Sequence, residues 1–498
     1  MQGLAIKPVS FESIPAGFRR ALMDLKNRKT VVVAGARGFV GQVLCLQLAK
    51  RFRVVALTRS LAHGQGLDEE GIEWRRCDMF SLLETEEALK GADYAVYLVH
   101  SMLPSSRLTQ GSFVDMDLIL ADNFARAARL HQVKQIIYLG GLIPKDTKLS
   151  RHLASRLEVE QSLGSGSTPV TALRAGLIVG PGGSSLRILV SLVHRLPVML
   201  LPPWVNSRMQ PVAIQEVVRA VDMVIGEPEY FGASYDIGGP DVLTYRELLQ
   251  KTVRLLERRT WMVNVPFITP GMSKFWVALF SGAPRTLVGP LVDSLKHDML
   301  AEPNPLLARL SVGAMGFEEA LRQSLDGKKR LIHTQLDRMR PRDLQVMRAA
   351  KRVRSVQRLP LPEGISAAWV AEEYYRWLPR FVWPFLECVV EDKTGRCRFY
   401  FGSRSVLLLE LAYSHKRSTQ DRVLFYITGG LLAKTSDNKK GRLEFREMLN
   451  RTCVLAAIHD FSPTLPWYFY NLTQAIAHLI VMRRFGRNLA LQKKPSGA

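Results

Sequence analysis

The chain has few cysteines, and they are not arranged as a disulfide framework or a metal site. There are five among 498 residues, an odd number, and no two stand at the spacing of metal ligands. Secreted domains that depend on disulfides are thereby excluded, and we expect a reducing compartment. The five are Cys45, Cys77, Cys388, Cys397 and Cys453.

The N-terminal segment lacks a continuous apolar stretch. Met1–Lys29 contains Glu12 and Asp24, which interrupt the pattern of a secretory signal. We therefore expect a cytoplasmic protein, one that also has access to a membrane surface through the segments described below.

Acidic residues are scarce relative to basic ones. The 68 Lys and Arg exceed the 45 Asp and Glu by 23 charges. The basic concentration from Lys328 to Arg358 has no interleaved aromatics, so specific nucleic-acid binding is not expected. Such a run either faces anionic lipid or forms a solvated helix between domains. The 47% hydrophobic content and the length indicate two or three folded domains.

The most informative pattern that is present is a glycine turn. Gly35, Gly38 and Gly41 follow the buried-strand run Thr30–Val33 and open a helical stretch, Gln42–Lys50. The three glycines permit a sharp turn, close approach of backbone amides to a pyrophosphate, and tight helix–strand packing. Strand, turn and helix in this order predict a dinucleotide site whose turn residues also include Arg37, Phe39 and Val40.

The second strand indicates which dinucleotide is bound. The run from Phe52 to Thr58 ends at Arg59 and Ser60, where an NAD-binding chain has an acid for the ribose hydroxyls. Arg59, with Arg37 in the turn, offers guanidinium groups to a 2′-phosphate. We therefore predict that NADP (as NADPH) is favoured over NAD.

Strands and helices continue to alternate after the turn, which predicts an α/β fold, a Rossmann-like doubly wound parallel sheet. Ligands of such sheets bind beyond the carboxyl ends of the strands. The expected further strands are 72–78, 93–99, 135–139 and 169–173. The residues at their ends are Asp78, His100-Ser101-Met102, Gly140-Gly141 and Arg174-Ala175-Gly176.

Several motifs between residues 29 and 325 resemble extended and atypical short-chain dehydrogenase/reductases, near the NmrA-like proteins and the relatives of the complex I 39 kDa subunit. In such proteins the acid at Asp78, followed by Met79, contacts the adenine, and the Arg174–Gly176 loop lies beside the nicotinamide. The resemblance also implies a substrate-covering part made of residues 182–208 and 244–325. The motifs are Gly35-x-x-Gly38-x-x-Gly41, 77–79, 98–102, 173–182, 210–214 and 237–245.

The chain departs from this family at the catalytic positions. Reductases of this kind carry Tyr-x-x-x-Lys, but His152 and Arg156 stand here, and Gly140-Gly141 replaces the usual serine. The catalytic candidates are His152 or His100 as proton donor and Arg156 as a ligand of the ribose or a phosphate. A structural role for His152 is the commoner alternative, and His100 can also orient the nicotinamide or a water. Tyr138 lies inside a strand and is expected in the core.

The C-terminal residues change character. Six strand-like stretches are flanked by an amphipathic helix, 366–378, and a long helix, 465–485. This order resembles the helix-grip, START-like lipid-binding superfamily and the uncharacterised domain often fused behind such dehydrogenases. We therefore expect an extension (1–28), an NAD(P)-binding domain (29–325), a basic linker (326–358) and an α+β helix-grip domain with an antiparallel sheet (359–498). The expected strands are 388–391, 397–402, 406–413, 422–428, 441–448 and 453–461.

The uncharged stretch Phe461–Met482 has the length of a membrane span, but prolines and a polar stripe at helical spacing interrupt it. We expect the core helix of the sheet domain. Its aromatic start at 467–470 and its basic end at 483–487 also suit a membrane interface.

Two functions remain. One is an NADP-dependent oxidoreductase acting on a small apolar or lipid-like substrate with non-standard catalytic residues. The other is a non-catalytic NADP-binding redox sensor or assembly protein. The missing tyrosine and lysine favour the second function, and the cavity-forming domain implied by the C-terminal resemblance favours the first.

Overall fold

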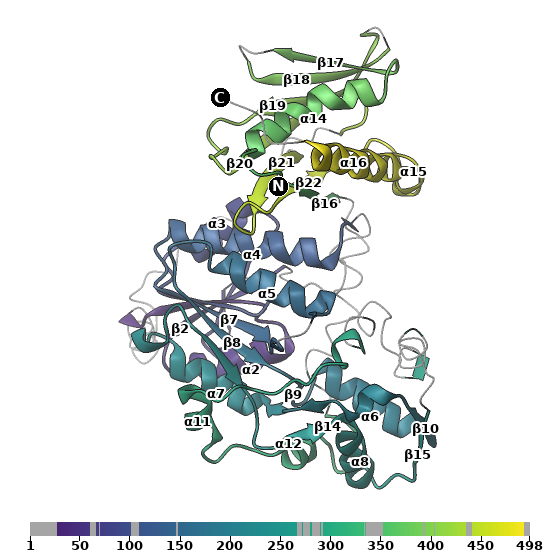
Figure 1. The fold of residues 1–498 in the computed structure, drawn as a ribbon. Helices are drawn as coiled ribbons and strands as arrows, with labels where there is room; N and C mark the ends of the chain where they lie inside the picture. The colour runs from purple at the N-terminus through teal and green to yellow at the C-terminus, as the bar shows by residue number, and fades with distance from the viewer. Residues whose placement is uncertain are drawn as a thin grey trace, which may run out of the picture.

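The computed structural model shows an N-terminal part that begins at 27 and a C-terminal part that begins at 352, stacked on one another in Figure 1. Ser60, Ser101, Met102 and most of the basic run, 335–351, lie outside the residues that the structure describes. The described residues are 27–59, 66–68, 70–100, 109–145, 148–265, 271, 279–280, 289, 292–332, 334, 352–391, 394–402, 404–434 and 441–492.

The N-terminal part is built on an eight-stranded sheet with the order β13-β8-β7-β5-β1-β2-β4-β3. All its pairings are parallel except that of β3 with β4. The predicted doubly wound parallel sheet is thus confirmed. The strands are β1 (Thr30–Ala34), β2 (Arg53–Thr58), β3 (Gly66–Leu67), β4 (Glu73–Arg76), β5 (Tyr94–Tyr97), β7 (Gln135–Gly141), β8 (Val170–Ala175) and β13 (Ser234–Ile237).

Helices cover both faces of this sheet, because its central strands are apolar on both sides and must be buried on both. One face packs against α2 (Phe39–Leu48), α7 (Ile214–Val224) and α11 (Pro305–Ser311). The other packs against α3 (Leu82–Leu89), α4 (Phe113–Leu130) and α5 (Arg151–Leu163). Tyr138 of β7 is 1% exposed and belongs to this second core, as predicted.

The segments expected to cover the substrate form a separate core beside the sheet, seen at the lower right of Figure 1. Its buried residues come from α6, α8 and α12 and from short strands between them. The bounds are α6 (Ser184–Arg195), β9 (Ile178–Val179), β10 (Val198–Leu201), β11 (Arg208–Met209), β12 (Val212–Ala213), β14 (Leu243–Thr244), α8 (Tyr245–Leu255), β15 (Trp261–Asn264) and α12 (Phe317–Gln323).

The C-terminal part contains a second eight-stranded sheet with the order β17-β18-β19-β20-β21-β22-β16-β6. It is antiparallel except where β6 joins β16. Helices α14 and α16 pack on one face. The bounds are β6 (Thr109–Gln110), β16 (Val353–Pro360), α14 (Ala367–Phe381), β17 (Leu386–Glu391), β18 (Arg396–Phe401), β19 (Val406–Tyr413), β20 (Arg422–Gly429), β21 (Arg442–Met448), β22 (Cys453–Phe461), α15 (Trp467–Leu472) and α16 (Gln474–Leu491).

Two features of the C-terminal part differ from expectation. The end of the stretch expected to be a linker, Val353–Arg358, is the first part of strand β16, which pairs with β22 along its length. The expected long helix is two helices, α15 and α16, with the break at Thr473, whose ψ of −83° is not helical. None of the helices among the described residues combines the length and apolar character that crossing a bilayer requires.

The two parts share a core. Val356 of β16 and Leu455 and Ala457 of β22 belong to the same buried cluster as the residues of α4. Strand β6, which precedes α4, is hydrogen-bonded into the second sheet. The C-terminal part is therefore held to the N-terminal part by direct packing, and not by a linker alone.

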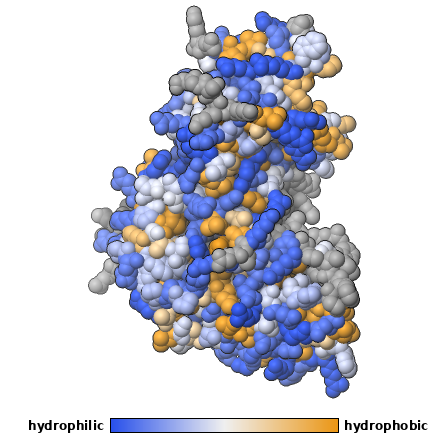
Figure 2. Space-filling model, in the orientation of Figure 1, coloured by the Kyte–Doolittle hydropathy of each residue, from blue (hydrophilic) through white to orange (hydrophobic). Residues whose placement is uncertain are grey.

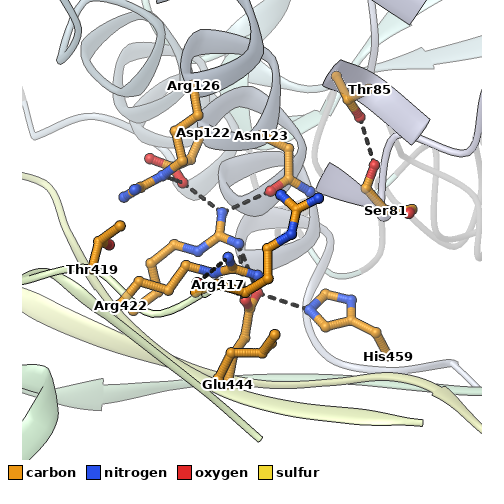
Figure 3. Close-up of polar contacts among 12 residues, drawn as sticks. Ser81, Thr85, Asp122, Asn123, Arg126, Arg417, Thr419, Arg422, Glu444 and His459 are labelled. Carbon is orange, nitrogen blue, oxygen red and sulfur yellow. Dashed lines mark hydrogen bonds and ion pairs between the residues drawn. The ribbon is translucent and has the colours of Figure 1, made fainter. Parts of the chain in front are cut away.

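A buried polar network lies in this contact (Figure 3). Arg446 of β21, 1% exposed, donates from Nη1 to Asp122 (2.5 Å) and Asn123 (2.7 Å) of α4. Glu444, fully buried, accepts from Arg446 (2.8 Å), Arg422 (2.6 Å) and His459 (2.8 Å). Burial would raise the pKa of Glu444, but these cations and His459 lower it well below its usual range. We call these six residues the seam cluster.

Two of the described basic residues near 358 also contact the N-terminal part. Arg358 donates to Asp115 of α4 (2.8 Å) and to both carboxylate oxygens of Glu158 of α5 (2.8 and 2.7 Å). Arg354 forms an ion pair with Asp78. At these positions the expected solvated helix is replaced by a strand whose arginines reach across the contact between the two parts.

Candidate cofactor-binding crevice

The glycine turn has the geometry of a dinucleotide-binding loop. Gly35 follows β1 with φ +84°, a conformation that favours glycine. A Cβ on Gly41 would lie 2.3 Å from the carbonyl oxygen of Gly35, so no other residue fits there. Gly38 is the N-cap residue of α2 and offers no side-chain cap, and its amide donates to the carbonyl of Gly35 (2.8 Å). The first turn of α2 carries no acid, so its amides and dipole suit a pyrophosphate.

Phe39, in the first turn of α2, packs against two glycines of the segment after β9. Its ring would lie 3.2 Å from a Cβ at Gly180 and 3.1 Å from one at Gly183, so both glycines leave room for it. Val40, next in the helix, is buried in the core under the same face of the sheet. These two predicted turn residues position the loop through packing.

Basic side chains collect where β1, β2 and β4 end. Arg59 directly follows β2 and is exposed, and Arg37 lies with its guanidinium 5.4 Å from the centre of the Trp74 ring. The register pairs Thr58 with Arg76, so a third exposed arginine, not singled out from the sequence, ends the neighbouring strand. The carboxyl end of β2 is thus basic, as an adenosine 2′-phosphate requires.

Asp78, expected to contact the adenine, lies beyond β4 and forms an ion pair with Arg354 of the C-terminal part. The Arg354 guanidinium also lies 4.7 Å from the centre of the Phe80 ring. Met79 is buried, and its carbonyl accepts from the Asn123 side chain (2.8 Å). A cation from the second sheet therefore stands at the expected adenine end of the crevice.

The catalytic candidates come together around an aspartate that the sequence did not single out. Asp117 of α4 is fully buried, and its Oδ2 lies 2.9 Å from His100 Nδ1 and forms an ion pair with Arg156 of α5. The ring centres of His100 and His152 are 5.2 Å apart. We call these four residues the crevice cluster. A signal for Asp117 existed: α4 has acids at 115, 117 and 122 within an otherwise apolar stretch.

Burial lowers the pKa of both histidines of the crevice cluster. Burial, His100 and Arg156 lower the pKa of His152 to about 3, and its Nδ1 is buried without a hydrogen-bond partner. Burial and Arg156 also lower the pKa of His100, while Asp117 opposes them. The His100 side chain keeps 27% of its surface exposed. A neutral His100 that donates from Nδ1 to Asp117 presents Nε2 as an acceptor.

Arg156 is 6% exposed and is held by Asp117, while its Nε has no partner. Its backbone carbonyl accepts from the Tyr138 hydroxyl (3.1 Å). Gly140 takes the position of the usual serine because a Cβ there would lie 2.8 Å from the Tyr138 ring. The missing serine thus has a packing reason.

The loop after β8 is close-packed. Arg174 donates two hydrogen bonds to Glu160 of α5 (3.0 and 2.6 Å), so its side chain is committed to that helix. Gly176 is flanked by Leu142, whose Cδ1 would lie 3.3 Å from a Cβ there. Any contact of this loop with a nicotinamide would therefore come from its backbone.

Comparison with known proteins agrees with this geometry. The model of the NAD(P)H-binding family matches residues 35–163, which include the glycine turn and the crevice cluster. The chain is 32% identical over 111 residues to auxiliary protein GraX of Staphylococcus aureus. This alignment covers 22% of this chain and 36% of GraX, so the chain spans about a third of the length of that relative.

Two further similarities extend over more of the chain. It is 24% identical over 286 residues to NADH dehydrogenase [ubiquinone] 1 alpha subcomplex subunit 9, mitochondrial, of Arabidopsis thaliana, covering 55% of this chain and 71% of that one. A Citrobacter triphenylmethane reductase complexed with NADP(H) aligns over 60% of this chain and all of its own (100%), with 19% identity and a TM-score of 0.47. The N-terminal part is thus a Rossmann-like fold, and its residues 35–163 are similar to the NAD(P)H-binding family.

Proposed function

We propose that the chain is an NADPH-dependent reductase acting on a small apolar or lipid-like carbonyl or quinone. The observation that carries this proposal is the crevice cluster. The glycine turn has the form of a dinucleotide loop and lies against Leu98 at the end of β5, and two residues further on a buried carboxylate orients the partly exposed His100. That pairing is an arrangement for proton transfer.

The residues present fit the cofactor. The amides at the start of α2 would hold the pyrophosphate, Arg37 and Arg59 the 2′-phosphate, and Arg156 the nicotinamide ribose. Bound NADPH supplies a hydride to the substrate.

His100 would deliver the accompanying proton from Nε2 to the substrate oxygen and regain one from solvent. Asp117 fixes the imidazole through Nδ1 and stabilises its protonated form. The negative charges of a bound dinucleotide act in the same direction, because an opposite charge raises the pKa of a histidine. His152, neutral down to a pH of about 3, would shape the pocket instead of donating a proton.

The C-terminal part is proposed to be a helix-grip domain that holds or delivers the apolar substrate. Support comes from the first strand, β16, which lies beside the last, β22, and from two helices on one face of the sheet. Native mass spectrometry of the purified full chain should then show a fatty or isoprenoid ligand beside the nucleotide. A chain that carries nucleotide but takes up neither fatty nor isoprenoid probes contradicts this assignment.

Cofactor preference is tested by calorimetry on the full chain. NADPH should bind at least tenfold more tightly than NADH, and Arg59→Asp should reverse the order, because a carboxylate repels the 2′-phosphate and accepts from ribose hydroxyls. Arg53→Asp, at the opposite end of the same strand, is the matched control and should leave the ratio unchanged. Equal affinities in the wild type and in Arg59→Asp would overturn the assignment.

A second candidate is a non-catalytic NADP(H) sensor. The observation that favours it is the replacement of the usual tyrosine and lysine by His152 and Arg156, with Arg156 already paired to Asp117. NADPH oxidation over a panel of quinones and ketones separates the two functions. Tight NADPH binding without turnover of any of them supports the sensor.

A further inference from the structure

The C-terminal part exposes large apolar side chains after α14 and on α15. Trp383 after α14 is 78% exposed, Leu472 in α15 is 71% exposed, and Trp467 is 51% exposed. Figure 2 shows apolar side chains gathered at the upper right, where Figure 1 places α15. Contiguous exposed apolar surface of this kind marks an interaction site, because isolated exposed residues are normal but clusters are not.

These side chains lie along one continuous edge. Phe385 stacks on Phe401, with ring centres 6.3 Å apart, and Phe401 pairs in register with Val406. The loop after β20 continues the line: the amide of Leu431 donates to Leu407 (2.9 Å), and Thr464 donates to Leu432 (3.2 Å) just before α15. We call this the aromatic edge, which consists of Phe381, Trp383, Phe385, Phe401, Leu431, Trp467, Tyr468, Phe469 and Leu472.

The described charges near the aromatic edge are mostly basic. Residues 461–492 contain three Arg and no acid, and on α14 Arg380 is exposed while Arg376 forms an ion pair with Glu372. Arg483, Arg484 and Arg487 are exposed on α16, whose opposite face is buried against the sheet. Glu387, the acid nearest the edge on β17, forms an ion pair with Arg404.

We propose that the aromatic edge docks on the surface of a lipid bilayer that contains anionic lipids. Tryptophan and tyrosine place an apolar ring and a polar group at headgroup depth, and cations near the surface are attracted to anionic headgroups. The exposed arginines beside the edge are complementary in charge to anionic headgroups, and this favours a bilayer over a second copy of the chain. This inference goes beyond the proposed reductase and does not depend on it, since the edge lies on a different part of the molecule from the crevice.

The test is co-sedimentation of the full chain with vesicles of phosphatidylcholine alone and of phosphatidylcholine with 30% phosphatidylglycerol. Binding should require the anionic lipid and weaken as salt rises from 50 to 300 mM, because the interaction is partly screened. Trp467→Ser/Phe469→Ser should lower partitioning at least tenfold. At low salt, Arg484→Glu/Arg487→Glu should lower partitioning more than Trp467→Ser/Phe469→Ser does.

Matched controls come from the other end of the molecule. Trp261 of β15 is 76% exposed, so Trp261→Ser removes as exposed a tryptophan far from the aromatic edge and should leave partitioning unchanged. Arg254→Glu/Arg259→Glu is the matched charge control. Circular dichroism and NADPH affinity of each variant show that the fold is intact.

Three results would overturn the proposal. They are the absence of binding to anionic vesicles at 50 mM salt, equal loss in the Trp261→Ser control, or a wild-type dimer in sedimentation velocity that Trp467→Ser/Phe469→Ser dissociates while vesicles bind neither form. The last result identifies the edge as a contact between copies of the chain.

Discussion

The crevice cluster and the seam cluster are built alike and differ in their access to solvent. Each has a fully buried carboxylate, Asp117 or Glu444, that accepts from a histidine and from arginine. His100 of the crevice cluster keeps 27% of its side-chain surface exposed, whereas His459 of the seam cluster keeps 4%. A carboxylate, a histidine and an arginine thus leave a histidine nitrogen accessible to solvent in the crevice cluster and bury it in the seam cluster.

The difference teaches how to separate function from stability in this chain. A sealed network must balance its own charges, because each unpaired buried charge costs several kcal/mol. In a network that is partly open to solvent, a ligand can reach the histidine, and an anionic ligand raises the pKa of that histidine. We therefore expect substitutions in the seam cluster to act on folding, and those in the crevice cluster to act on the titration of His100 and on turnover.

The largest effect is expected at the centre of the seam cluster. Arg446→Met leaves Glu444 and Asp122 with one cation fewer at a site without solvent. It should lower the free energy of unfolding by about 3–5 kcal/mol, measured by urea denaturation. The double variant Arg446→Met/Glu444→Gln restores the balance of charges and should recover part of this loss. A double variant no more stable than the single one would show that packing, and not charge, holds the seam.

The next effect separates the two clusters directly. Asp117→Asn removes the carboxylate between Arg156 and His100 and should cost about 3 kcal/mol, at the low end of the range for the seam because the His100 side chain is partly exposed. It should also lower the pKa of His100 further, since Asp117 is the group that raises it. Titration by NMR measures this without a known substrate.

Glu444→Gln is the matched control for Asp117→Asn. It should destabilise the chain through the loss of a buried anion but leave the pKa of His100 unchanged. With NADPH and an active substrate, only Asp117→Asn should change the pH profile of turnover. If the two variants shifted the His100 titration equally, the division between an open and a sealed cluster would fail.

The pH dependence of stability sharpens the comparison further. His152 has a pKa of about 3 when folded, below the value near 6.5 of an unfolded chain. Between these values the unfolded state binds more protons, so stability falls as pH falls from about 6.5 towards 3. His152→Gln should therefore be about 2–3 kcal/mol less sensitive to acidification from pH 7 to 4.5, by thermal or urea unfolding.

His478 of α16 gives an internal check on that slope. Burial lowers its pKa to about 4, so His478→Gln should flatten the same curve over a slightly narrower range. A His152→Gln variant with the wild-type slope would mean that His152 takes up its proton in the folded state. The folded-state pKa of His152 would then lie near the unfolded value, and His152 would return to the candidate proton donors.

The sequence was sufficient for the local features of the fold. The glycine turn, the parallel strands and the strands 406–413 and 453–461 follow from local patterns of apolar residues and glycines, and the structure has them at or near the predicted bounds. These features depend on neighbouring residues, which periodicity can detect.

Features that depend on distant residues were missed. The sequence of β16 alternates, but its arginines favoured a linker because Asp78, Asp115 and Glu158, which neutralise them, stand 200 or more positions away. Nothing in the sequence pairs Cys388 with Cys397, yet their sulfurs lie 3.2 Å apart across β17 and β18. Asp117 was overlooked because its partners lie on two other segments.

The smallest expected effect lies at the rim of the contact between the two parts. Arg417, in the turn before β20, donates to both oxygens of Glu86 of α3 (3.2 and 2.9 Å), but its side chain is 27% exposed and that of Glu86 is 19% exposed. Water and salt screen such a pair, so Arg417→Met should cost about 0.5–1 kcal/mol. A double-mutant cycle with Glu86→Gln at 0.05 and 0.5 M salt measures the coupling. A coupling above 2 kcal/mol that ignores salt would mean that the sealed character of the seam cluster extends to the rim.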